Sequence, residues 1–159
     1  MSRTFSSLGI FNYRLWFVGA LIANIGTWMQ RIAQDWLVLT ELTDNSGFAV
    51  GIVTALQFLP TVFLTPVAGV LTDRFNRRRI LIVTQSALGV LAAALGTMVL
   101  LGVAELWHVY VFASLLGVVS ALDAPARQVF VSELVPADQL SNAVGLNSAS
   151  FNAARLVGP

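Results

Sequence analysis

The chain has 159 residues, of which 57% are hydrophobic and 11% are charged, and its formal net charge is +1. A soluble domain carries about 25% charged residues, so this chain has too few to cover a surface that faces water. Cysteine is absent, which excludes disulfides, thiolate catalysis and cysteine-bound metals. We therefore expect an integral membrane protein.

Five apolar segments are long enough to cross a bilayer, which takes about 20 mostly apolar residues. They are too long for the strands of a membrane barrel and lack the two-residue alternation of such strands. Helices are the remaining way to satisfy backbone polar groups in lipid, so the expected fold class is an all-α membrane protein. The expected spans are 15–39, 48–71, 80–103, 106–122 and 141–159.

Proline and small residues add detail to the second, third and fourth spans. Pro60 and Pro66 lie inside the second span and predict bends there, because proline interrupts helical hydrogen bonding. Rows of small residues at helical spacing predict close packing between helices. These rows are Gly89, Ala93 and Gly96 on the third span, and Ala113, Gly117 and Ala121 on the fourth.

The connection between the fourth and fifth spans has its own pattern. Residues 127–134 follow Pro125 and predict a short amphipathic helix at the cytoplasmic interface. Pro136 is expected to end that helix, and Ser141 or Asn142 is expected to cap the fifth span.

The positions of the arginines predict the orientation in the membrane. Every arginine outside the apolar segments lies beside an alternate link, so all of them fall on one side of the bilayer. Arginine-rich links face the cytoplasm, which places the N-terminus there too. The residues on this side are Arg3, Arg14, Arg74, Arg77, Arg78, Arg79 and Arg127, while the opposite links hold Glu41, Asp44 and Glu105.

The first expected span carries a polar stripe. At 100° per residue, four side chains fall within about 40° of one line: Asn24, Trp28, Arg31 and Asp35. One interpretation is that this stripe faces an aqueous cavity and contacts substrate or a coupling proton, since intramembrane charges usually face a cavity. The other is a self-contained pair of Arg31 and Asp35 near the outer interface. Gln30 and Gln34 lie off the line and are weaker candidates.

A second polar stripe lies on the fifth expected span. Ser148, Asn152 and Arg155 share one helical face. An arginine well inside a span needs either a partner or water, and Asp35 is one candidate partner. A functional and a structural role for this stripe both remain open.

Residues 69–79 form the strongest motif, at the junction of the second and third spans. A tight turn must reverse the chain there; Gly69 is expected to permit close helix packing and Asn76 to adopt a left-handed conformation. Asp73 is an acid within a basic cluster, and it either neutralises the neighbouring arginines or has a role of its own.

The loop sequence Gly69-x-x-x-Asp73-Arg74-x-Asn76-Arg77-Arg78-Arg79 resembles the loop between spans two and three of major facilitator transporters. That family usually has glycine where this chain has Asn76. Three other stretches resemble its drug- and siderophore-efflux branch: residues 28–31, 123–128 and 146–159.

The resemblance implies twelve spans in two six-helix halves, with the substrate bound between the halves. It also implies that the loop is a cytoplasmic latch in which Asp73 faces a helix of the other half and Arg77 reaches Asp123. Latch contacts must form in one state and break in the other. The implied latch residues are Gly69, Asp73, Arg74, Arg77, Arg78 and Asp123.

We expect a secondary active transporter of the cytoplasmic membrane that exports a small amphiphilic molecule, drug- or siderophore-like, against a coupling proton. Candidate residues of the substrate and proton pathway are Asn24, Arg31, Asp35, Asn152 and Arg155. The expected partners are this substrate, the lipid bilayer and a missing C-terminal half, because the chain stops at Pro159 inside a span.

A non-transporting scaffold, or a truncated remnant of a broken gene, is the alternative. Genomic sequence beyond the codon for Pro159 would separate the two. Further apolar segments favour the transporter, and an in-frame stop favours the remnant. No motif for an enzyme, a cofactor, a metal or nucleic acid is recognised, and topology explains the arginines of the loop.

Overall fold

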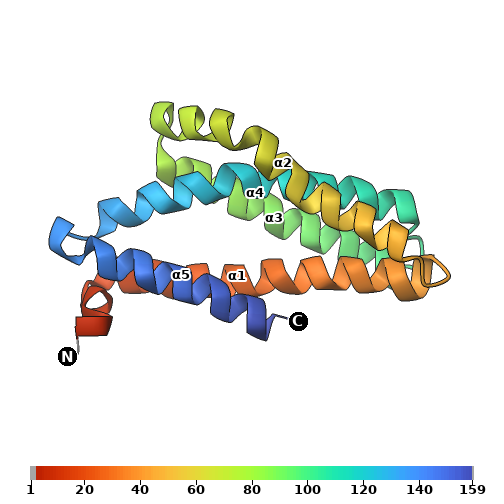
Figure 1. Ribbon diagram of the computed structural model, residues 1–159, viewed down its shortest axis with the longest axis horizontal. Coiled ribbons are helices and arrows are strands. Elements are labelled where there is room, and N and C mark those ends of the chain that lie inside the picture. The colour runs from red at the N-terminus through yellow and green to blue at the C-terminus, as the bar shows by residue number, and fades with distance from the viewer. Residues whose placement is uncertain (1–2, 159) are drawn as a thin grey trace. The chain divides into compact units, whose positions relative to one another are not determined.

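A computed structural model describes residues 3–158, and its helices are joined by short links with no strand in the described part (Figure 1). This confirms the predicted all-α fold class. The side chains of Arg3 and Thr4, and the expected end of the fifth span at Pro159, lie outside the described residues. The elements are η1 Arg3–Gly9, α1 Phe11–Leu37, η2 Val38–Leu42, α2 Gly47–Arg74, α3 Arg77–Leu100, α4 Leu106–Leu134, η3 Ala137–Gln139 and α5 Leu140–Val157.

Three helices of the described chain, α2, α3 and α4, are long and apolar enough to cross a membrane. Helices α2 and α4 contain the second and fourth expected spans, and α3 covers the third as far as Leu100, three residues before its expected end. Large apolar side chains stay exposed on them, for example Val62 and Phe63 on α2 and Val83 on α3. Helices that meet lipid need such a surface. Membrane crossing by α1 and α5 stays a prediction.

The end of α4 differs from the sequence-based expectation. Residues 127–134 do not form a separate helix, because α4 continues through Pro125 to Leu134. Proline inside a helix removes one backbone hydrogen bond, a loss that neighbouring helices in a membrane protein can offset. The short helix expected at the interface is therefore the final part of α4.

The turn between α2 and α3 consists of two residues, Phe75 and Asn76. Asn76 has extended backbone angles (φ −64°, ψ 114°), so the expected left-handed conformation is wrong. Its side-chain oxygen instead accepts a hydrogen bond from the backbone N–H of Arg79, 3.2 Å away. Asparagine is favoured at this position because it satisfies an N–H group that the first helical turn leaves without a partner.

The start of α5 also corrects an expectation. The chain turns at Pro136, as predicted, and passes through η3 into α5 at Leu140. Ser141 and Asn142 therefore lie inside the helix and do not cap it. The Asn142 side-chain oxygen accepts a hydrogen bond from the backbone N–H of Ser7 instead, at 3.1 Å.

Pro60 and Pro66 lie inside α2, which stays a single helix from Gly47 to Arg74. Figure 1 shows that α2 changes direction along its length, in agreement with the predicted bends. A sharp bend at proline follows from the lost N–H and from the clash of its ring with the preceding turn.

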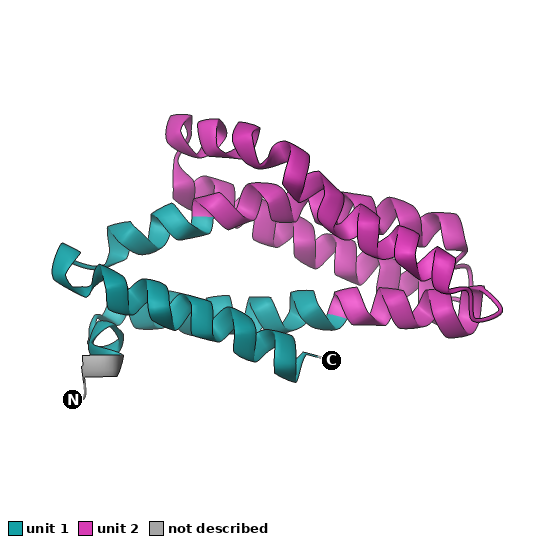
Figure 2. Ribbon diagram, viewed as in Figure 1, with its two compact units in different colours: residues 1–29, 127–159 teal, residues 30–126 magenta. Residues whose placement is uncertain are grey.

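The chain divides into two compact units, coloured separately in Figure 2. Unit 1 comprises residues 1–29 and 127–159, and unit 2 comprises residues 30–126. Helices α1 and α4 each contribute to both units, while α2 and α3 belong wholly to unit 2 and α5 to unit 1. Each unit is described by itself below.

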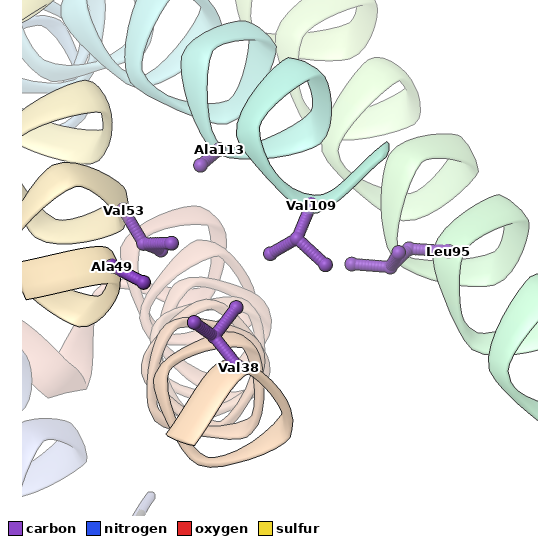
Figure 3. Packing of buried hydrophobic residues seen from close by; sticks show 6 residues of the cluster. All are labelled: Val38, Ala49, Val53, Leu95, Val109 and Ala113. Atoms are coloured by element: carbon purple, nitrogen blue, oxygen red, sulfur yellow. The ribbon is translucent and has the colours of Figure 1, made fainter. Parts of the chain in front are cut away.

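The apolar core of unit 2 joins η2, α2, α3 and α4 (Figure 3). Its buried members are small or β-branched apart from one leucine, which lets the helices approach closely without large side chains between them. They are Val38, Ala49, Val53, Leu95, Val109 and Ala113.

Gly117 marks the closest approach between α2 and α4. A Cβ atom at this position would lie 2.6 Å from the backbone oxygen of Leu56 and 2.8 Å from that of Gln57. Ala113 and Ala121, on either side of it, are 0% and 1% exposed. The predicted row of small residues on α4 is therefore a packing surface.

The row predicted on α3 does not pack in this way. A Cβ atom at Gly89 or at Gly96 would have no heavy atom within 4 Å among the described residues. The same holds for Gly69 on α2, so the close packing expected there is not observed within the described chain.

Unit 1 has its own core, built on Tyr13 of α1. Tyr13 is fully buried and packs with Val131 of α4, Val135 directly after α4 and Ala143 of α5. Its hydroxyl donates a hydrogen bond of 2.9 Å to the backbone oxygen of Ala143. A buried tyrosine needs such a partner, and this bond ties the start of α1 to the start of α5.

Candidate functional site

A buried polar cluster lies between α1, α2 and α4 within unit 2. Arg31 and Gln34 belong to α1, Gln57 to α2 and Ser120 to α4. Arg31 is 7% exposed, and Gln34 and Gln57 are each 1% exposed. Polar groups removed from water cost free energy unless they are hydrogen-bonded, so the contacts among these side chains decide whether the cluster is stable.

Gln57 connects α2 to α1. Its side-chain N–H group donates to the side-chain oxygen of Gln34 at 2.9 Å and to the backbone oxygen of Arg31 at 3.5 Å. Sequence analysis ranked Gln34 low because it lies off the polar stripe, and it did not consider Gln57. Gln57 interrupts a long apolar segment, which is the signal that could have identified it.

Arg31 connects α1 to α4. Its Nη2 donates to the Ser120 hydroxyl at 3.3 Å, and its guanidinium carbon lies 4.3 Å from the centre of the Phe58 ring. The aromatic face attracts the cation and the hydroxyl accepts one of its N–H groups. Neither Ser120 nor Phe58 was predicted as part of the site.

Asp35 lies one helical turn beyond Arg31 on α1 and is half-buried. Its Oδ1 is buried and has no hydrogen bond to any described residue. Nη2 of Arg31 donates to Ser120, and a direct contact between Arg31 and Asp35 stays a prediction. Burial disfavours the charged form of a carboxylate, whereas a nearby cation favours it.

Asn24 belongs to unit 1 and has a different partner. It is 6% exposed, and its Oδ1 accepts a hydrogen bond of 3.0 Å from Nη1 of Arg127 on α4. Sequence analysis used Arg127 only for orientation, so its contact with a candidate pathway residue is new information from the structure.

The polar stripe on α5 lies on an exposed face of unit 1. Ser148, Asn152 and Arg155 are all exposed, and the Asn152 side chain donates to the Ser148 backbone oxygen at 2.9 Å. The guanidinium carbon of Arg155 lies 5.3 Å from the centre of the Trp28 ring. The Trp28 ring belongs to α1 and the Arg155 guanidinium to α5, so the two helices meet here within unit 1.

The predicted latch residues surround the turn from α2 to α3. Asp73, Arg74 and Arg78 are exposed, and Arg77 is half-buried. An exposed charge cluster at the end of a helix pair can form and break contacts at little cost, because water solvates its members when they separate.

Asp123 lies on α4 in unit 2 and is 5% exposed. Its Oδ1 accepts two hydrogen bonds from α3, one of 2.6 Å from the Thr84 hydroxyl and one of 2.9 Å from Nε2 of Gln85. Neither donor was predicted from the sequence. A contact between Arg77 and Asp123 stays a prediction.

No group of three or more histidine or acidic side chains that could hold a metal ion occurs among residues 3–158. The hydrogen-bonded site in unit 2 consists of amide, hydroxyl and guanidinium groups. Such groups can form hydrogen bonds with polar groups of an organic ligand.

A family model described as transmembrane secretion effector, of the major facilitator superfamily, matches residues 2–159. The chain belongs to this family. Membership agrees with the all-helical fold and with the resemblance carried by residues 69–79.

Individual members of the major facilitator superfamily are also similar to the chain. It is 27% identical over 147 residues to the staphyloferrin A transporter of Staphylococcus aureus, covering 92% of the chain and 36% of that protein. It is 30% identical over 138 residues to an uncharacterized transporter of Bacillus subtilis, covering 87% of the chain and 32% of that protein. Macrolide efflux protein A of Streptococcus pyogenes is 24% identical over 149 residues, with shares of 92% and 36%.

The chain thus spans about a third of the length of the curated relatives that it matches. No solved structure matches the chain. For this member of the transmembrane secretion effector family, the polar network of unit 2 is the candidate site, and transport is the general function of its relatives.

Proposed function

We propose that this chain is part of a secondary active transporter that exports a small amphiphilic molecule, drug- or siderophore-like, in exchange for protons. The observation that carries the proposal is the polar network of unit 2, where Arg31, Gln34, Gln57 and Ser120 meet between apolar helices. Charged side chains within membrane helices cost free energy, up to about 2.5–3.5 kcal/mol at the helix centre on insertion scales, and they usually mark functional sites.

In this proposal the network lines a path for substrate. Arg31 supplies a positive charge held beside the Phe58 ring, and Phe58 itself is 43% exposed. An aromatic face next to a cation and amides suits a ligand that has both apolar and polar parts. A further set of helices, as in the longer relatives, completes the path.

Asp35 is the proposed carrier of the coupling proton. Its carboxylate is half-buried on the same helix as Arg31, with Oδ1 removed from solvent. Protonation of Asp35 neutralises the nearest counter-charge of Arg31 on α1. Release of the proton restores the negative charge of Asp35. Exchange of a proton for substrate follows if each ligand binds more tightly to a different state of the network.

The direction of transport is proposed from the names of two relatives. One is a staphyloferrin A transporter and another is a macrolide efflux protein. Only the second name states a direction, which is efflux. The drug- and siderophore-efflux branch that the sequence resembles implies the same direction, so we propose export. The proposed location is the cytoplasmic membrane, with the N-terminus and residues 74–79 on the cytoplasmic side.

The proposal is tested by measuring which small molecules accumulate in cells that lack the intact gene and in cells where it is restored. Restored cells should contain less of at least one amphiphilic compound. A protonophore should raise its level in restored cells to that of the deletion strain. Equal accumulation in both strains contradicts export, and a difference that survives the protonophore contradicts proton coupling.

The latch role of residues 69–79 gives a separate prediction. Replacing Asp73 with alanine in the complete protein should reduce efflux by about tenfold, equivalent to ~1.4 kcal/mol, because the closed state loses a charged contact. Expression should be preserved, since Asp73 is exposed in the described chain. The measurement is the initial rate of substrate loss from preloaded cells, normalised to protein in the membrane.

Asp44→Ala is the matched control for Asp73→Ala. Asp44 is also an exposed acid in a link between helices, on the side opposite to the predicted latch. Efflux by this variant should equal that of the unmodified protein. An unchanged rate in Asp73→Ala would rule out the latch, and equal losses in both variants would point to a general requirement for surface acids.

A further inference from the structure

An aromatic and cationic surface on α1 and α5 of unit 1 is not part of the polar network in unit 2. It consists of Trp28, Phe151 and Arg155. The Trp28 and Phe151 rings meet edge to face, with centres 5.6 Å apart, and the guanidinium of Arg155 lies 5.3 Å from the centre of Trp28. Arg155 is exposed, and Phe151 is 48% exposed.

Gly158 allows the end of α5 to approach α1 closely beside Trp28. A Cβ atom at Gly158 would lie 2.9 Å from Cβ of Trp28 and 3.2 Å from the backbone oxygen of Ile25. The absence of a side chain at Gly158 therefore permits this approach, which brings α5, the helix that carries Phe151 and Arg155, next to Trp28.

The guanidinium of Arg155 is available to a ligand. Among the described residues none accepts a hydrogen bond from it, and its observed interaction is the cation–π contact with the Trp28 ring. This contact uses none of its N–H donors, whose fork can match the two oxygens of a carboxylate. Ser148 and Asn152 extend the same polar face along α5.

We propose that Trp28, Phe151 and Arg155 form a subsite for an organic anion, namely a carboxylate attached to an aromatic or other flat apolar group. Arg155 binds the carboxylate, and the two rings pack against the apolar part. An exposed arginine on a helix expected at bilayer depth needs an anion or water beside it. The inference rests on the proposed function, since it assigns a chemical class to the exported molecule.

The test uses two probes of nearly equal shape, 1-naphthaleneacetate and its neutral amide. Binding of tritiated 1-naphthaleneacetate to the purified complete protein in detergent is measured by scintillation proximity, with the amide as competitor and no proton gradient. The unmodified protein should bind the acetate about tenfold more tightly than the amide, as expected for one charge-assisted contact.

Variants separate the roles of the three residues. Arg155→Gln should remove the preference for the acetate, while Arg155→Lys should keep part of it because the charge remains. Trp28→Leu should weaken both probes by a similar factor. Arg14→Gln is the matched control, because Arg14 on α1 is also an exposed arginine of unit 1, and its guanidinium carbon lies 5.7 Å from the centre of the Phe11 ring.

Two results would overturn the subsite. One is equal binding of both probes to the unmodified protein, and the other is an equal loss in Arg14→Gln and Arg155→Gln. If Arg155→Gln instead lowers the melting temperature without changing the ratio of affinities, then Arg155 pairs with a protein carboxylate and the subsite is likewise excluded. Because binding is measured without transport, failure of proton-coupled export leaves this result interpretable.

Discussion

Replacing Gly117 with alanine is expected to lower the stability of the folded protein by about 1–3 kcal/mol, the usual range for forcing extra volume into a packed interface. The new Cβ atom would lie 2.6 Å and 2.8 Å from two backbone oxygens of α2, and 2.9 Å from Cγ of Pro60. Backbone atoms cannot rotate away, so α2 and α4 must separate. The measurement is thermal unfolding of the detergent-solubilised protein, followed by size-exclusion chromatography after heating.

Gly89→Ala and Gly96→Ala are the matched controls for Gly117→Ala. Each introduces the same methyl group in the interior of a long helix, but at a position with no described atom within 4 Å. Alanine is a better helix former than glycine by about 1 kcal/mol, so these variants should be as stable as the unmodified protein or more stable. A Gly117→Ala variant that unfolds at the same temperature as the controls would show that the approach of α2 to α4 is not tight.

Replacing Arg31 with leucine is expected to reduce efflux by about 10- to 100-fold, which corresponds to ~1.4–2.8 kcal/mol. The substitution removes the charge beside Phe58 and the bond to Ser120. The loss of a charge buried among apolar helices and the loss of a cation near half-buried Asp35 act in opposite directions on stability, so the melting temperature should change little. The measurements are efflux from preloaded cells and thermal unfolding in detergent.

Separate measurements of activity and stability distinguish a functional role of Arg31 from a purely structural one. If Arg31 only holds helices together, Arg31→Leu should unfold at a lower temperature and retain efflux in the fraction that folds. Arg31→Lys keeps the charge but loses the flat guanidinium that lies over the Phe58 ring. Its efflux rate should therefore lie between those of the unmodified protein and Arg31→Leu. Arg14→Leu, which removes an exposed arginine from the same helix, should leave efflux unchanged.

The helices were predictable because composition and length determine them. A chain with 57% hydrophobic residues and apolar segments of this length has few alternatives in lipid. The boundaries were less predictable, as the continuation of α4 through Pro125 demonstrates. Proline has a strong local preference, but helix packing outweighed it here, and packing is not visible in a single sequence.

The candidate site was predictable only on one helix. Arg31 stood out as a charge in an apolar segment, whereas Gln57 and Ser120 became relevant through contacts with it from other helices. The angular position of a residue around α1 also does not identify the neighbouring helix that it faces. Gln34 was ranked low for that reason and proved to be hydrogen-bonded to Gln57.

The acidic residue of α4 illustrates the same limit. Asp123 was associated with the latch because of family resemblance, and the structure adds two neutral side chains of α3, Thr84 and Gln85, that donate to its Oδ1. Gln85 interrupts the apolar segment of α3 as Gln57 interrupts that of α2, but the local sequence does not say which residue it contacts. Their role follows from helix pairing, which places α3 against this part of α4.

The contact at Gly117 couples two positions that are distant in the sequence. Pro60 has no N–H group, so the Leu56 backbone oxygen one turn earlier lacks its usual helical donor. That oxygen is the one that faces Gly117, where a Cα–H group can make a weak hydrogen bond worth about 0.5–1 kcal/mol. Positions 60 and 117 should therefore covary. Among related sequences, those that lack the proline should also have a substitution at the glycine, and the reverse should hold.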